Sequence, residues 1–372
     1  MSREAGAPES AAYREAGVDY ATLDAAKRLA LAAARSTSAV RLPAGAVFSD
    51  ASRGEPAQVI EVGGLRLGFV LECLGTKSML AREIEEASGQ DHFAAIGYDT
   101  VAAVVNDLIC VGALPLVVNA YFATGSAGWY AGSRHASLVE GWRRACVDAG
   151  AVWGGGESPT LSGLVAPDEV DLAGSAIGIV PEDRAPLCGE ALEPGDEIVL
   201  VASSGLHANG ASLARQVARH LPDRLEHRLE SGASLGAALL APSHSYVALV
   251  RALLEDGLPL HYASHITGHG LRKLMRAQRE LTYRIEALPE VPEVLAFIVE
   301  HADLAPAEAY GTLNMGAGFA LYLAPGAAGR AVALAAAHGL SALRAGVVDA
   351  GPRQVLLEPL GVRFGGEQLE LA

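Results

Sequence analysis

The chain has 372 residues, of which 51% are hydrophobic and 19% are charged, and its formal net charge at pH 7 is −15. This length and apolar content are enough for two domains with buried cores. A chain this acidic lacks the clustered lysine and arginine that a broad nucleic-acid footprint requires, so we expect no nucleic-acid partner.

Cysteine spacing and the first residues indicate the compartment. The cysteines Cys73, Cys110, Cys146 and Cys188 lie far apart with no CxxC pair, which disfavours a zinc site and a disulfide framework. The opening MSREAGAPESAAYREAG has no apolar signal core. No apolar run reaches the roughly 18 residues of a membrane span. We therefore expect a cytoplasmic protein without a membrane partner.

The first half of the chain alternates strand and helix patterns. Its first dozen residues are small and polar, and a loop rich in Gly, Pro and Ser extends to about residue 56. The predicted helices are 20–34, 98–113 (ended by Gly112 and Pro115) and 133–149, and the predicted strands are 58–63, 65–72, 114–124, 151–158 and 170–180.

A charged segment with two prolines, residues 182–197, interrupts this pattern, and we place the domain boundary there. The predicted organisation is an N-terminal segment 1–56, a first domain 57–182 and a second domain 183–372. The second domain is expected to contain strands at 198–203, 260–265, 318–325, 344–350 and 354–359, and helices at 211–221, 243–257, after the glycine turn ending near 271, and at 327–339. Alternating strands and helices predict an α/β or α+β fold.

The segment YDTVAAVVND, residues 98–107, carries acidic side chains without a neutralising cation. At helical spacing, Asp99 and Asn106 lie within about 20° of each other, opposite the valines, and Asp107 lies about 80° away. A solvated face of an amphipathic helix is one explanation. The other is that these side chains hold a ligand.

Two glycine turns of the first domain have features of binding loops. LECLGTK, residues 71–77, is not a P-loop, but its glycine, Thr76 and Lys77 can approach a phosphate. WGGGESPTLSG, residues 153–163, places Glu157 where backbone crowding is small, which suits a metal ligand. In isolation, a plain strand-to-helix turn is the alternative for the first stretch, and a flexible turn with a helix-capping polar cluster is the alternative for the second.

Two further glycine turns occur in the second domain, each between a strand and a helix pattern. SSGLHANG, residues 203–210, aims backbone amides outward, and its His207 can move a proton near neutral pH. A surface histidine is the alternative. HITGHG, residues 265–270, repeats the design with Thr267. Two such turns predict a pocket built from strand ends.

Carboxylates form the other pattern. Glu72, Asp99, Asp107 and Glu157 each stand beside glycine or small apolar residues. Oxygen ligands of this kind suit Mg²⁺ that bridges nucleotide phosphates. Asp99 and Asp107 lie about 12 Å apart along a helix, so they cannot hold one ion together.

In this order, the stretches resemble the aminoimidazole ribonucleotide (AIR) synthetase family, the phosphoribosylformylglycinamidine cyclo-ligases of purine synthesis. YREAGVDY at 13–20 resembles the family's N-terminal signature. The other matching stretches, over roughly residues 13–350, are GYDTVAAVVNDLICVGALPL, YFATG, GGGES, VDLAGSAIGIV, SSGLHANGASL, HITGHG and TLNMGAG.

The resemblance implies a two-domain PurM-like fold. The N-terminal domains of two chains would pair into a shared β-barrel, which makes a homodimer, and the C-terminal domain would be an α/β sandwich. It also implies ATP and Mg²⁺: ATP phosphorylates an amide oxygen of formylglycinamidine ribotide, and a nearby nitrogen closes the ring with loss of phosphate.

The resemblance assigns roles by position. His207, Asn209 and Lys77 would be catalytic, and Glu72, Asp99, Asp107 and Glu157 would bind metal. The nucleotide-binding residues would be Gly75, Thr76, Lys77, Asn106, Gly155, Gly156, Thr267 and Gly268.

The chain also departs from the family pattern where ribotide and phosphate are expected. Cys73, Ala120, Thr160, His269 and Gly311 replace residues typical of the family. Two alternatives therefore stay open: a paralogue that activates an amide or carbonyl of a different substrate, and a non-catalytic dimer that binds nucleotide.

Overall fold

The structure is a computed structural model that describes residues 20–369, with side-chain surroundings from residue 26 onward. Of the predicted N-terminal signature at 13–20, only Tyr20 lies within the described residues. The first described element is helix α2 (Tyr20–Ser36), which confirms the helix predicted at 20–34.

The first half of the chain forms a six-stranded sheet. The strand order is β1-β2-β3-β6-β4-β5, antiparallel throughout except for the parallel pair β4 and β5. Its strands are β1 (Val47–Phe48), β2 (Gln58–Val62), β3 (Leu65–Cys73), β4 (Leu114–Thr124), β5 (Val152–Glu157) and β6 (Val170–Val180). Burial alternates along β6, because successive side chains point to opposite faces. One face is therefore apolar enough to pack against helices.

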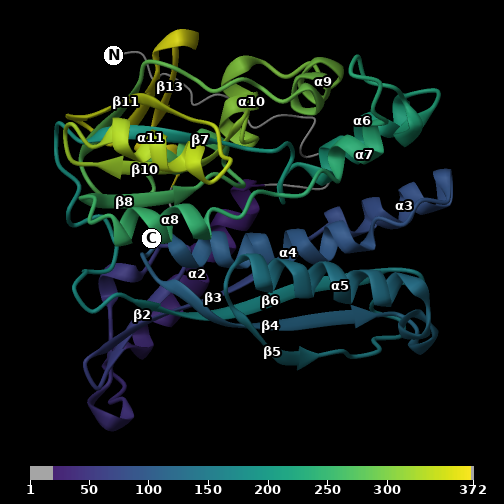
Figure 1. The fold of residues 1–372 in the computed structure, drawn as a ribbon, viewed down its shortest axis with the longest axis horizontal. Coiled ribbons are helices and arrows are strands. Elements are labelled where there is room, and N and C mark those ends of the chain that lie inside the picture. The colour runs from purple at the N-terminus through teal and green to yellow at the C-terminus, as the bar shows by residue number, and fades with distance from the viewer. Residues whose placement is uncertain (1–19, 370–372) are drawn as a thin grey trace.

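Three helices accompany this sheet: α3 (Lys77–Ser88), α4 (Phe93–Ile109) and α5 (Ser133–Asp148). Helices α4 and α5 pack against each other, and α4 lies between the two sheets of the molecule (Figure 1). Gly141 permits this approach, since a Cβ there would collide with the backbone of Ala94.

The second half forms a seven-stranded mixed sheet in the order β13-β12-β9-β11-β7-β10-β8. Its strands are β7 (Glu197–Ala202), β8 (Leu260–His265), β9 (Leu281–Ile285), β10 (Ala317–Leu323), β11 (Ala342–Ala350), β12 (Gln354–Leu357) and β13 (Val362–Gly365). Its helices are α6 (Ala211–His220), α7 (Leu235–Leu239), α8 (Val247–Glu255), α9 (Glu293–His301), α10 (Pro306–Thr312) and α11 (Ala328–Ala337). Every residue of β10 is buried, and the strand lies inside the sheet between β7 and β8.

Several predicted boundaries were wrong. The helix predicted at 98–113 begins at Phe93 and ends at Ile109, and the helix predicted at 243–257 begins only at Val247. The helix expected after the HITGHG turn is a short 3₁₀ turn, η6 (Gly270–Met275). The elements not predicted, since they are short or carry many polar residues, are β1, α3, α7, β9, α9, α10 and β13.

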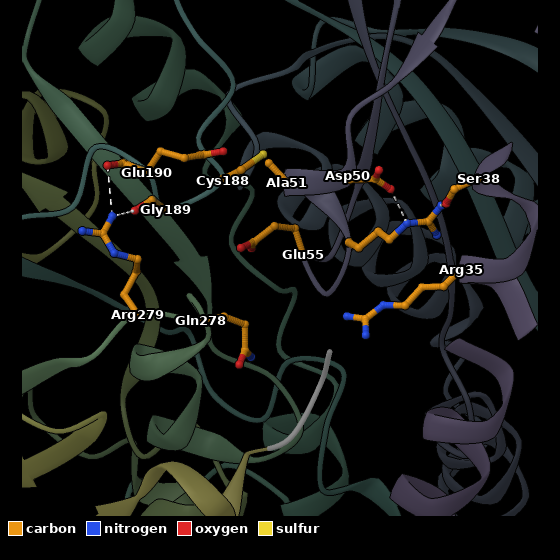
Figure 2. Close-up of a pocket in the computed structure, with 11 residues that line it drawn as sticks. Arg35, Ser38, Asp50, Ala51, Glu55, Cys188, Gly189, Glu190, Gln278 and Arg279 are labelled. Carbon is orange, nitrogen blue, oxygen red and sulfur yellow. Dashed lines mark hydrogen bonds and ion pairs between the residues drawn. The ribbon is translucent and has the colours of Figure 1, made fainter. Parts of the chain in front are cut away.

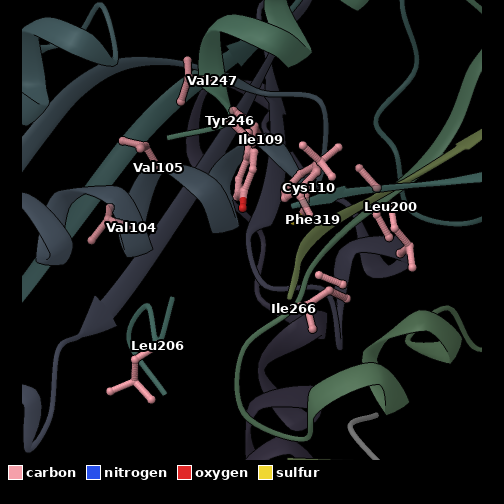
Figure 3. Close-up of a cluster of buried hydrophobic side chains, with 14 of the residues drawn as sticks. Val104, Val105, Ile109, Cys110, Leu200, Leu206, Tyr246, Val247, Ile266 and Phe319 are labelled. Carbon is pink, nitrogen blue, oxygen red and sulfur yellow. The ribbon is translucent and has the colours of Figure 1, made fainter. Parts of the chain in front are cut away.

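A continuous apolar core joins the two halves. Val105 and Ile109 of α4 pack in one cluster with residues of the second sheet and of α8, among them Phe319 and Val247 (Figure 3). Helix α4 is thus buried by both sheets, and its polar residues Asp99, Asn106 and Asp107 are buried with it. Their explanation as a solvated helix face is wrong. Among residues 20–369, no helix is both long and apolar enough to cross a membrane.

Candidate active site between the two sheets

A cavity of about 160 Å³ lies where the two halves of the chain meet. The first half contributes the end of β3 and one side of α4, and the second half contributes the loop after β7 and the turn after β8. The lining residues are Glu72, Cys73, Ala103, Asp107, Ala208, Asn209, His265, Thr267 and Gly268. The structure thus brings together five residues predicted for the site, Glu72, Asp107, Asn209, Thr267 and Gly268.

Two carboxylates, Glu72 and Asp107, line this cavity, and their pKa values are shifted in opposite directions. Burial, together with the charge of Asp107 and a hydrogen bond to it, raises the pKa of Glu72 to about 8. Burial acts on Asp107 in the same direction, but the hydrogen bond and charge of His265 outweigh it and lower the pKa of Asp107 to about 2. At neutral pH Glu72 is therefore protonated beside an ionised Asp107.

Such a pair of facing carboxylates fits a divalent cation. A cation that takes oxygen ligands would replace the proton of Glu72 and relieve the repulsion between the two carboxylates. The cavity also offers the hydroxyl of Thr267 and the amide of Asn209. All of these are oxygen-bearing groups of the kind Mg²⁺ prefers, so the residues fit Mg²⁺.

His265 and Lys273 belong to the site although neither was assigned a role from the sequence. His265 Nδ1 donates to Asp107 Oδ1 at 2.7 Å, which orients the carboxylate. Lys273 Nζ donates to Thr267 Oγ1 at 3.1 Å. Burial and the charge of Arg276 lower the pKa of Lys273 to about 8. His265 could have been found as the first residue of the HITGHG turn, and Lys273 as one of only three lysines in the chain.

Lys77 and Asp99 form a buried ion pair instead of contacting the cavity. Lys77 Nζ lies 2.6 Å from Asp99 Oδ2, and both side chains are 0% exposed. Asp99 Oδ1 also accepts the backbone N–H of Ser243 at 2.7 Å. In this structure a lysine from α3 neutralises Asp99, where the sequence pattern predicted a metal ion, and Asp99 does not line the cavity.

Asn106 of α4 also links the two halves of the chain. Its Nδ2 donates to the carbonyl of His244 at 2.8 Å, and its Oδ1 accepts the N–H of Tyr246 at 2.9 Å. Because Asp99 and Asn106 lie on one side of α4, both form hydrogen bonds with the backbone of the segment that leads into α8. Both polar atoms of the Asn106 side chain are occupied by these hydrogen bonds, so the structure does not support the nucleotide-binding role predicted for Asn106.

His207 also has a different environment from the one predicted. Its ring is 2% exposed, and its Nε2 accepts the N–H of Ser204 at 3.0 Å. Burial, with the charges of His265 and Lys77, holds its pKa well below the usual range. The ring stays neutral and out of the cavity, so it cannot move a proton there. Its carbonyl instead accepts a hydrogen bond from Lys77 at 2.6 Å.

Five predicted residues lie elsewhere. Gly155, Gly156 and Glu157 are exposed on β5, the edge strand of the first sheet. Gly75 and Thr76 are exposed before α3, where Thr76 Oγ1 lies 2.8 Å from Ser212 Oγ of α6. Within this one chain, none of the five lines the cavity between the sheets.

A second, larger cavity of about 520 Å³ lies beside the N-terminal segment (Figure 2). Some of its polar side chains already have protein partners: Arg53 pairs with Asp50, and the buried Glu55 accepts the hydroxyl of Tyr262 at 2.7 Å. The contact of Glu55 with Tyr262 of β8 attaches the segment before β2 to the second sheet. No residue predicted for the site lines this cavity.

Comparison with known proteins agrees with this architecture. Residues 54–180 match the family model for the N-terminal domain of AIR synthase related proteins, and residues 193–357 match the model for the C-terminal domain. The phosphoribosylformylglycinamidine cyclo-ligase of Anaeromyxobacter sp. (strain Fw109-5) is 36% identical over 363 residues, which is 94% of this chain and 99% of that protein.

Solved structures show the same fold. The crystal structure of tt0281 from Thermus thermophilus is 26% identical with a TM-score of 0.54, and the match covers 83% of this chain and 90% of that one. The structure of AaThiL complexed with AMPPCP and TMP has a TM-score of 0.57 at 16% identity, covering 83% of this chain and 89% of the other. These matches confirm the predicted two-domain, PurM-like α/β fold.

The two-sheet fold and the two family models define the chain as an AIR synthase related protein. One curated relative matches almost the whole of both chains. The protein accordingly belongs to the phosphoribosylformylglycinamidine cyclo-ligase family, as the resemblance predicted.

Proposed function

We propose that the protein is an ATP-dependent cyclo-ligase that converts formylglycinamidine ribotide to aminoimidazole ribotide, ADP and phosphate. The observation that carries this proposal is the meeting of Glu72 and Asp107 with the two glycine turns of the second half in one cavity. Family membership supports the reaction class. The cavity supports the use of a metal-bound phosphate donor.

The reaction needs activation because an amide oxygen is a poor leaving group. Transfer of the terminal phosphoryl group of ATP to that oxygen makes it a phosphate, and ADP leaves. A nitrogen of the same substrate then attacks the carbon, closes the ring and expels phosphate. Catalysis of such a transfer depends on positioning and on neutralising charge.

The chain's own residues would provide both the positioning of the reactants and the neutralisation of charge. Glu72 and Asp107 would hold Mg²⁺, which neutralises the phosphate chain when it is bound. His265 keeps Asp107 oriented toward the cavity. Asn209, fixed by its hydrogen bond to the carbonyl of Thr312 at 2.7 Å, presents its remaining amide oxygen to the substrate side.

Incubation of the purified protein with ATP, Mg²⁺ and formylglycinamidine ribotide tests this function. We expect equimolar ADP, phosphate and aminoimidazole ribotide, and we expect EDTA to stop their formation. Phosphate release must depend on the ribotide. A folded protein that binds MgATP but forms no product from this ribotide would contradict the proposed substrate.

One observation favours a second candidate, the same activation chemistry on a substrate without a phosphate. Among the residues that line the cavity, none is an arginine, the usual partner of a ribotide phosphate. His269 also occupies a left-handed position, with φ 71°, in the adjoining turn. Phosphate release with other amides, and none with the ribotide, would support this candidate. Nucleotide binding without turnover of any amide would indicate the non-catalytic dimer.

We further propose that two copies pair through the open face of the first sheet. This face turns away from α4 and α5, and Phe69 and Ile177 stand opposite each other on it. Six of its side chains are between 38% and 73% exposed: Leu65, Phe69, Leu71, Leu116, Val152 and Ile177. A contiguous apolar surface of this kind is typical of a protein interface. A second copy would also cover β5 with Glu157.

The variant Leu71→Glu tests the pairing. Leu71 is 73% exposed, and a buried charge in place of a leucine is expected to weaken the dimer at least about 100-fold. Light scattering after size exclusion should show wild-type dimer and variant monomer. Leu164→Glu is the matched control, because Leu164 is 80% exposed outside the sheet and should leave the mass unchanged. A monomeric wild type would refute the pairing.

A further inference from the structure

Lys273 is held at the rim of the cavity by groups from two elements. Its carbonyl accepts the hydroxyl of Ser264, in β8, at 3.0 Å, and its side chain is 8% exposed. Its Nζ reaches Thr267, one of the cavity residues, at 3.1 Å. The lysine therefore has a defined direction, toward the space that Glu72 and Asp107 face from the other side.

The ammonium of Lys273 keeps donors for a ligand. An ammonium has three N–H groups, and among the described residues the one hydrogen bond of Lys273 Nζ is to Thr267. It forms no ion pair within residues 20–369, although Asp107 and Glu72 are close enough to act on its charge. A buried cation without a direct anionic partner in the protein is costly, so an anion from outside would stabilise it.

The other buried lysine of this interface has no such capacity. Lys77 is 0% exposed and is satisfied by Asp99 and by the carbonyl of His207, each at 2.6 Å. Lys77, which the sequence pattern assigned to phosphate binding, is thus already paired with protein groups of both halves of the chain. Lys273 instead lies directly behind the cavity lining, with its Nζ 3.1 Å from the hydroxyl of the lining residue Thr267.

We propose that Lys273, and not Lys77, supplies the ammonium that contacts the phosphate chain of bound ATP, opposite the carboxylate pair of Glu72 and Asp107. This inference rests on the proposed function, since it needs ATP in the cavity. Thr267 positions the ammonium, and the metal side of the site neutralises the other phosphate oxygens. A compact ammonium suits this place, because it can contact several oxygens as a point charge.

The test is the affinity for MgATP, measured by calorimetry without turnover. Lys273→Met removes the charge and keeps the length of the side chain, so we expect MgATP binding to weaken about 10- to 100-fold. Lys273→Arg should recover part of the loss. Lys77→Met, measured at a temperature at which it is folded, should stay within about 3-fold of wild type because its partners are protein groups.

A second measurement separates this role from damage to the metal site. Binding of Mn²⁺ alone, followed by electron paramagnetic resonance, should be unchanged or tighter in Lys273→Met, because a positive charge leaves the neighbourhood of the carboxylates. Equal losses of Mn²⁺ and MgATP binding, or MgATP affinity within about 3-fold of wild type, would overturn the role of Lys273. Failure of the wild type to bind MgATP would instead overturn the proposed function.

Discussion

Replacement of Lys77 by methionine is expected to lower the free energy of unfolding by about 3–5 kcal/mol. The change leaves the Asp99 carboxylate buried without its cation, and both side chains are 0% exposed in the intact pair. The carbonyl of His207 loses its donor as well. Urea denaturation followed by circular dichroism gives the difference directly.

Two controls identify the cause of this loss. The double variant Lys77→Met/Asp99→Asn should recover at least half of it, since asparagine removes the unpaired charge and its Oδ1 can still accept from Ser243. Arg143→Met breaks an ion pair whose side chains are 56% and 57% exposed, so its cost should stay below about 1 kcal/mol. A Lys77→Met protein as stable as wild type would show that the pair does not clamp the two halves.

Asp107→Asn is expected to weaken Mg²⁺-dependent ATP binding by roughly 100-fold or more while the fold is kept. The amide has the shape of the carboxylate and its Oδ1 can still accept from His265, but it lacks the charge that holds the cation. Calorimetry with MgATP, with the melting temperature as a check on folding, measures both effects. An unfolded variant would make Asp107 a structural residue.

The pH dependence gives an independent readout of the same variant. The folded pKa of Glu72 is raised from 4.5 to about 8, so the unliganded native state holds a proton that the unfolded chain releases. Stability without metal should therefore fall as pH rises from about 4.5 to 8, and Mg²⁺ binding should strengthen over the same range because the ion displaces that proton. In Asp107→Asn this dependence should cover a narrower pH range, because burial still raises the pKa of Glu72 but the like charge beside it is gone.

The secondary structure that could be predicted was that of long periodic segments. Strong apolar patterns occur in strands β3, β4, β6 and β7 and in helices α2 and α5. The spacing of apolar residues along these segments is enough to distinguish strand from helix. Helix α3 follows the LECLGTK turn with a largely polar sequence, and β9 is only five residues long. Neither has a pattern that local spacing distinguishes from a loop.

The candidate site could be predicted in part for the same reason. Glycine turns after apolar strands identified the positions of Asn209, Thr267 and Gly268, and acidic residues beside small ones identified Glu72 and Asp107. His207, Asn106 and Asp99 have the same residue types in similar positions. Residue type alone does not distinguish a side chain that faces a cavity from one that faces a neighbouring backbone.

The sequence by itself determined the family and the alternation of strands and helices, because these depend on local order along the chain; it also supplied the candidates from which the five cavity residues come. The partner of each polar group was decided by the tertiary structure. Helix α4 lies between two sheets, so Asp99 meets Lys77 from α3 and Ser243 from before α8, while Asp107, two turns further along, meets His265 and the cavity. A buried charge takes whichever partner packing brings within reach: Lys77 for Asp99, and for Asp107 the ring of His265, 158 positions away.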